Sequence, residues 1–272
     1  MPGDIHYILF GMHHIILDAY SFSIMFRELE EAYTRGFLAA QPTASQYRFF
    51  ANEERPLCAS GALTGAMEYY RTLLPAAADI QPLKLLPYAK ITRRRTLTVY
   101  KRNEAKIRIP SDLASRVRQL ARGSKSTSFH VYLAAMQLLL FQHLPSAQEL
   151  VIGIADANRS DKQFMNSIGF FLNLLPLRFV RDDNHTSVAS VTQKARDKAH
   201  VALAHSQLPF DVLLRELKVP RSSKHTPLFQ VFVDYRQVPR ERSSWCGCKV
   251  ESEAWHAAET GYDIALEVTE SA

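Results

Sequence analysis

The chain has 272 residues, of which 47% are hydrophobic and 22% charged, with a formal net charge of +6 at pH 7. These proportions are ordinary for a globular protein and exclude a disordered or low-complexity chain. No apolar run reaches the roughly 18 residues of a membrane-spanning helix. The first residues also lack the charged-then-apolar order of a secretory signal, so we expect a cytoplasmic location.

The cysteines and the basic residues indicate no disulfide framework, metal site or nucleic-acid partner. Three cysteines, Cys58, Cys246 and Cys248, are too few and too odd in number for such a framework, and we expect free thiols. Cys246 and Cys248 lack a second pair of metal ligands nearby. The basic residues at 93–95 and 101–102 lack the context of an RNA-binding motif. We therefore predict a solvated basic face there, with neither nucleic acid nor membrane as partner.

The first informative stretch predicts a strand followed by a helix. Residues 7–17 are apolar and rich in β-branched side chains, which favours a buried strand. From residue 22 to residue 37 the large apolar residues recur at helical spacing. Asp18 or Ser21 can cap this helix, and Gly36 can help to end it.

Two adjacent histidines and an aspartate lie where this strand meets the helix. Polar side chains at such a junction can be held rigidly at the mouth of a cleft. Because neighbouring residues of a strand point to opposite faces, at most one of His13 and His14 can face a given cleft. A single histidine in an apolar run is more often structural, so these residues alone do not establish a site.

The rest of the chain predicts an α/β fold with a mixed sheet and packed helices. Pro75, Pro82 and Pro87 indicate a connector between two lobes. His130 lies off an apolar helical stripe and is most simply a surface or partner-bonded side chain. The periodicity predicts helices over 61–74, 111–123, 128–143, 186–203 and 209–214, and strands over 105–109, 150–155, 171–180, 228–235 and 262–268.

A second stretch, residues 168–178, carries polar side chains within an apolar strand. Asn173 and Arg178 interrupt this strand, and both need partners if they are buried. A buried guanidinium is tolerated only beside a carboxylate. The sequence therefore predicts an acidic partner for Arg178.

Four motifs in this order resemble those of nonribosomal peptide synthetase condensation domains, which are chloramphenicol-acetyltransferase-like acyltransferases. They are His13-His14-x-x-x-Asp18-Ala19, Asn158-Arg159, Ile168-Gly169-Phe170-Phe171-Leu172-Asn173 continuing to Arg178, and the stretch 220–228. The likeness is greatest to the domains of fungal polyketide–peptide hybrid synthases. One position departs from the family, because Ala19 stands where the motif has glycine. If that position requires a positive φ, alanine costs about 1 kcal/mol or more there.

The resemblance implies a two-lobed, chloramphenicol-acetyltransferase-like sandwich. Residues 1–80 would be the remainder of an N-terminal lobe that carries the histidine motif. Residues 81–95 would be the inter-lobe linker, and residues 96–272 a C-terminal lobe that is incomplete at its end. By this likeness the chain is expected to be truncated at both ends.

The resemblance also implies an activity and roles for the motif residues. A condensation domain forms an amide bond between a carrier-bound polyketide or peptidyl thioester and a carrier-bound aminoacyl thioester in secondary metabolism. His14 would be the catalytic residue, and Asn173 and Ser21 would line the substrate channel. His13 and an ion pair between Asp18 and Arg178 would support the site.

The partners implied are acyl or peptidyl carrier domains and neighbouring synthase domains. Phosphopantetheine would be carried by the carrier domains, and no cofactor is expected to bind this chain directly. Two alternatives stay open: an inactive relic that serves as a scaffold or docking module of a megasynthase, and a standalone acyltransferase that uses the generic HxxxD pattern.

Overall fold

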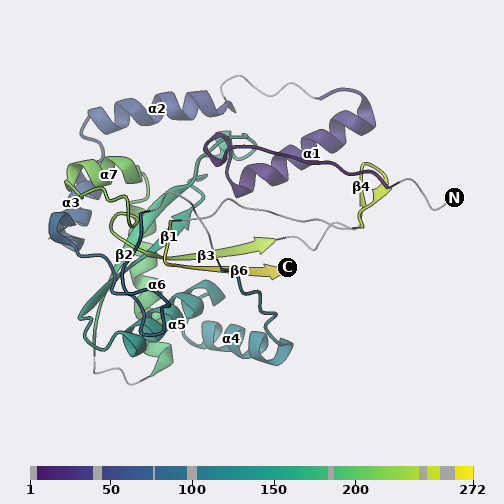
Figure 1. Ribbon diagram of the computed structural model, residues 1–272. Coiled ribbons are helices and arrows are strands. Elements are labelled where there is room, and N and C mark those ends of the chain that lie inside the picture. Colours follow the sequence, from purple (N-terminus) through teal and green to yellow (C-terminus); the bar gives the residue numbers. More distant parts are fainter. Residues whose placement is uncertain are drawn as a thin grey trace.

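A mixed four-stranded sheet organises the chain (Figure 1). The computed structural model describes residues 5–38, 45–75, 77–96, 103–182, 187–238, 244–251 and 261–271. The sheet strands are β1 (Glu149–Asp156), β2 (Asn173–Val180), β3 (Val231–Val238) and β6 (Ile264–Ser271), in the spatial order β2-β1-β3-β6. β1 runs antiparallel to β2 and parallel to β3, and β3 runs parallel to β6. A separate short hairpin joins β4 (Ser244–Trp245) to β5 (Cys248–Lys249).

Helices cover both faces of this sheet (Figure 1). Because side chains alternate along a strand, Ile152 and Ile154 of β1 face one layer and Val151 faces the other. The first layer is α5 with α6, and the second is α3 with α7. The helices are α1 (Ala19–Arg35), α2 (Tyr47–Ala59), α3 (Thr64–Leu73), α4 (Ser111–Gly123), α5 (Ser128–His143), α6 (Val188–Ala204) and α7 (Phe210–Glu216).

The predicted α/β class with a mixed sheet is confirmed. The bounds of α4 and α5 coincide with the predicted helices at 111–123 and 128–143. The division into lobes at residues 80 and 96 stays a prediction. Met67 of α3 shares a buried cluster with Leu213 of α7, so α3 packs onto the same sheet as the C-terminal elements.

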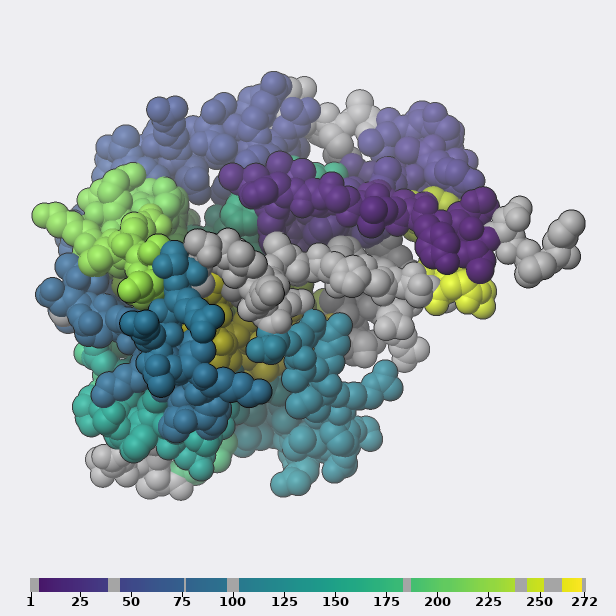
Figure 2. Space-filling model, viewed as in Figure 1, coloured from purple at the N-terminus to yellow at the C-terminus, as the bar shows by residue number. Residues whose placement is uncertain are grey.

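The predicted buried strand over residues 7–17 is wrong. Residues 5–13 form no strand, and the side chains of Tyr7 and Leu9 are 89% and 94% exposed. This segment runs across the surface of the molecule (Figure 2). A strand is stable only beside a neighbour that takes up its hydrogen bonds, and no strand pairs with this segment in the described part of the chain. The predicted strand over 105–109 is also absent, and Ile107 is exposed.

The helix predicted after this segment is α1, and its ends are as expected. The Asp18 side chain accepts a hydrogen bond from the Ser21 N–H, which makes Asp18 the N-cap. Gly36 ends the helix in the left-handed conformation at φ 75°. No helix among the described residues is long and apolar enough to cross a membrane.

In the predicted solvated basic face Arg93 and Arg95 are exposed, whereas Arg94 is half-buried and forms an ion pair. Arg94 donates to the Asp263 carboxylate and to the Leu83 carbonyl oxygen. These contacts tie the connector that contains Leu83 and Arg94 to the residue just before β6. The other predicted members, Lys101 and Arg102, lie outside the described residues.

Gly153 in β1 has no room for a side chain, and we expect Gly153→Ala to lower the free energy of unfolding. A Cβ atom there would lie 2.1 Å from Cε2 of the buried Phe229 ring. Overpacking of this kind costs about 1–3 kcal/mol. The control is Gly65→Ala in α3, where no atom lies within 4 Å of the added Cβ. Urea unfolding measures the loss of unfolding free energy in both variants. Equal losses in the two variants would contradict the packing argument.

His130 is buried at the start of α5, where it completes a capping box with Thr127. Its Nδ1 atom accepts a hydrogen bond from the Thr127 N–H at 3.1 Å. Burial lowers the pKa of His130 from 6.5 to about 4, with further lowering by His200 and Arg196 against a small opposing effect of Asp197. The neutral ring is therefore the form that fits the fold.

This burial predicts a loss of stability in mild acid. The unfolded chain takes up a proton at His130 near pH 6.5, whereas the folded chain does so only near pH 4. The free energy of unfolding should therefore decrease by about 2–3 kcal/mol as the pH is lowered from 6.5 to 4. Urea unfolding at several pH values measures the slope, and His130→Gln should flatten it. An unchanged slope in that variant would assign the acid sensitivity to other groups.

Candidate active site

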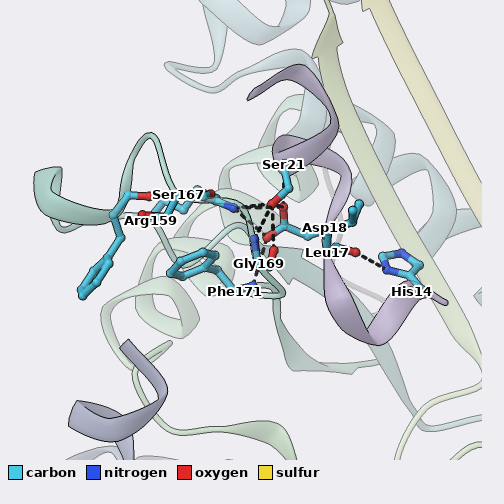
Figure 3. A network of polar contacts seen from close by, with 9 residues as sticks. His14, Leu17, Asp18, Ser21, Arg159, Ser167, Gly169 and Phe171 are labelled. Carbon is cyan, nitrogen blue, oxygen red and sulfur yellow. Dashed lines mark hydrogen bonds and ion pairs between the residues drawn. The ribbon is translucent and has the colours of Figure 1, made fainter. Parts of the chain in front are cut away.

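The Asp18 carboxylate is the centre of a buried polar network that joins the start of α1 to the loop before β2 (Figure 3). One oxygen accepts from the Ser21 N–H at 2.9 Å and from the Ser21 hydroxyl at 2.8 Å. The other accepts from the Phe171 N–H at 3.1 Å. The Asp18 N–H donates to the Gly169 carbonyl at 3.1 Å. These bonds fix the turn that follows the histidines.

Arg159 is the cation that balances Asp18. Its Nη2 atom lies 3.1 Å from one carboxylate oxygen, and the arginine side chain is only 4% exposed. The other end of the guanidinium donates to the carbonyl oxygens of Phe164 at 3.0 Å and Ser167 at 2.8 Å. The guanidinium carbon lies 4.1 Å from the centre of the Phe171 ring. A buried pair with this many hydrogen bonds can repay the cost of removing both charges from water.

The predicted pairing of Asp18 with Arg178 is wrong. Arg178 donates to the Glu149 carboxylate at 2.9 Å, across the β1–β2 pair, in a partly exposed position. The reason is strand alternation, because Leu177 and Phe179 turn into the core and Arg178 must turn to the other face. The Asn158-Arg159 motif was the signal in the sequence that could have located the true partner.

The structure places Asn173 inside the protein instead of at a substrate surface. Its Nδ2 atom donates to the carbonyl oxygens of Ser206 at 2.7 Å and Leu208 at 2.8 Å. Its Oδ1 atom accepts from the N–H groups of Leu174 and Phe210. These bonds tie the start of β2 to the start of α7. Asn173 has no free polar group left for a substrate, contrary to the predicted channel role.

Ser21 is likewise a supporting residue. It is fully buried, and its hydroxyl donates to Asp18 or to the Gly169 carbonyl while accepting from Arg159 and from the Gly169 N–H. Because its hydroxyl is buried and its hydrogen bonds are taken up inside the protein, Ser21 does not line a surface open to substrate, contrary to the predicted channel role.

Ala19 causes no strain at the position where the motif has glycine. It is the first residue of α1 and is absent from the residues with positive φ. Alanine is the most favourable residue in a helical conformation. The departure from the motif therefore carries no backbone cost here.

The two histidines differ in their surroundings. The Nδ1 atom of His13 accepts from the Ile15 N–H at 3.1 Å and so caps the short 3-10 helix His14–Ile16. The Nδ1 atom of His14 lies 2.9 Å from the Leu17 carbonyl oxygen (Figure 3). Because a carbonyl oxygen only accepts, this hydrogen bond places the His14 proton on Nδ1. The Nε2 atom then keeps a lone pair, for which no described residue is a partner.

A family model described as the condensation domain matches residues 3–272. The chain belongs to the condensation-domain family. Trichosetin synthetase PKS-NRPS1 of Gibberella fujikuroi is 58% identical over 271 residues, and equisetin synthetase of Fusarium heterosporum is 56% identical over 271 residues. Each alignment covers 100% of this condensation domain but only 7% of the relative, so the chain spans a small part of these large synthetases.

Solved structures confirm the predicted fold. The condensation domain of the monacolin K polyketide synthase MokA superposes with a TM-score of 0.77 at 24% identity, covering 95% of this chain and 60% of that one. The X-domain from teicoplanin biosynthesis superposes with a TM-score of 0.73 at 23% identity, covering 95% and 58%. The predicted membership of the condensation domains, with its likeness to fungal hybrid synthases, is thereby confirmed.

Proposed function

We propose that this condensation domain joins a carrier-bound polyketide or peptidyl thioester to a carrier-bound aminoacyl thioester by an amide bond. Both substrates would hang on phosphopantetheine arms of carrier domains, which are the partners expected for a segment of a hybrid synthetase. The single observation that carries the proposal is the His14 ring, whose Nδ1 atom bonds to the Leu17 carbonyl and whose Nε2 atom has no partner among the described residues.

The reaction needs a base at the attacking amine. The amine nitrogen adds to the thioester carbonyl, which forms the C–N bond and places a positive charge on nitrogen. His14 Nε2 takes one proton from that nitrogen, and the C–S bond then breaks to release the phosphopantetheine thiolate. The same proton passes from the imidazolium to the thiolate, so the ring returns to its starting form. General base catalysis of this kind contributes about 10²–10⁴-fold.

The supporting residues hold the base and take no part in the bond changes. His13 caps the turn on which His14 lies. Asp18 and Arg159 lock that turn to the loop before β2. The second large contribution is proximity, because two tethered reactants meet without a bimolecular encounter in solution.

The test supplies the full chain with two carrier domains, one loaded with an acyl thioester and one with an aminoacyl thioester, and detects the amide by mass spectrometry. We expect amide product above the rate without protein. Binding of the loaded carriers without any product would identify a docking module instead. Product only from a small acyl thioester and a free amine would identify a standalone acyltransferase.

A further inference from the structure

The side chain of Phe170 lies beside His14, and the sequence motifs assign no role to it. The rings of His14 and Phe170 meet edge to face, with their centres 5.6 Å apart and their planes at 87°. This is a favourable arrangement for two aromatic rings. His14 itself is exposed, so the Leu17 carbonyl and the Phe170 ring are the contacts that define its orientation.

The backbone of Phe170 is fixed on both sides by the Asp18 network. On one side the Gly169 carbonyl accepts from the Asp18 N–H, and the Gly169 N–H donates to Ser21. On the other side the Phe171 N–H donates to the Asp18 carboxylate (Figure 3). Phe170 therefore lies between two residues that are each tied to the turn carrying His14.

Packing holds the same loop from its far side. A Cβ atom on Gly169 would lie 2.4 Å from the Tyr47 ring, so the backbone lies directly against α2. The Phe171 ring enters a cluster with Phe50 and Phe164. With its neighbour held in this cluster, the half-buried Phe170 ring stays beside His14.

We propose that Phe170 is a positioning residue that holds the His14 ring in the tautomer and orientation with Nε2 free. The proposal rests on the proposed function for its catalytic meaning, because it deepens the role of His14. In this role Phe170 contacts the base and acts on the reaction through it. The Asp18–Arg159 pair acts on the base partly through this ring.

The test follows the His14 ring by NMR of the full chain labelled with ¹⁵N-histidine, with its signals assigned by their loss in His14→Gln. In the native chain we expect a protonated Nδ1 and an unprotonated Nε2. Phe170→Leu should mix the two tautomers and lower kcat for amide formation roughly 3- to 10-fold with little change in KM, the scale of one lost aromatic contact. Phe170→Tyr keeps the ring and should restore both readouts. Circular dichroism establishes that each variant is folded.

The matched control is Ile168→Ala, a truncation of an apolar side chain in the same loop. It should leave the His14 tautomer and kcat as in the native chain. An unchanged tautomer in Phe170→Leu, or an equal change in Ile168→Ala, would overturn the proposal. A shifted tautomer in a chain that forms no amide would support the positioning role and refute the proposed function, so the two failures are distinguishable.

Discussion

We expect Arg159→Met to lower the free energy of unfolding by about 3–5 kcal/mol, the range for removing one partner of a buried ion pair. Arg159 is the cation beside the buried Asp18 carboxylate, and its side chain is 4% exposed. Methionine keeps much of the apolar volume but leaves that carboxylate without a countercharge. It also removes two donors to loop carbonyls. Urea unfolding followed by circular dichroism measures the loss.

The chain offers a matched control in Arg178→Met. This residue is also an arginine paired with a carboxylate, but its side chain is 30% exposed and that of Glu149 is 47% exposed. Solvent-exposed pairs contribute about 0–1 kcal/mol, so this variant should lose little. If both arginine variants lost the same free energy, the buried network would not be the feature that stabilises the turn.

The second large effect is expected in catalysis. His14→Ala should lower kcat for amide formation by about 10²–10⁴-fold, the contribution of a positioned general base. Stability should change little, because His14 is exposed and its hydrogen bond among the described residues is to a single backbone carbonyl. The assay is the loaded-carrier reaction at saturating concentrations of both substrates.

The variant His13→Ala tests whether catalysis depends on the His14 ring alone or on both histidines of the motif. His13 caps a three-residue turn with Nδ1 and has no contact with the Leu17 carbonyl. We expect a loss below about 10-fold, because one N-cap contact is worth about 1 kcal/mol. Equal losses in the two histidine variants would show that the pair acts through the turn and not through one imidazole.

Local signals predicted the helices well. α4 and α5 begin and end as predicted because their apolar stripes lie between clear boundaries. Pro110 is the N-cap of α4 and Ser111 its first residue, and the helix ends at Gly123 with Ser124 as its C-cap. The strands of the sheet were found for the same reason, since short apolar runs bounded by polar loops fit interior strands.

Contacts between segments that are far apart in the chain could not be predicted from the sequence. An apolar run such as 7–17 indicates that a strand is favourable, but a strand exists only beside a partner, and composition does not supply one. The partner of Asp18 is a similar case, because two arginines, Arg159 and Arg178, were available. Alternation along β2 could have excluded Arg178, since Leu177 and Phe179 are the core-facing residues. The Phe170 contact with His14 required coordinates.

We infer that Arg159 contributes to catalysis only by holding the turn that carries His14. A double-mutant cycle in kcat tests this most directly, with Arg159→Lys, His14→Ala and the double variant assayed where circular dichroism shows all to be folded. Lysine keeps the charge but loses the fork of donors to Asp18, Phe164 and Ser167. We predict that Arg159→Lys slows the native chain and has no further effect once His14 is alanine. Equal rate losses in both backgrounds would contradict the account.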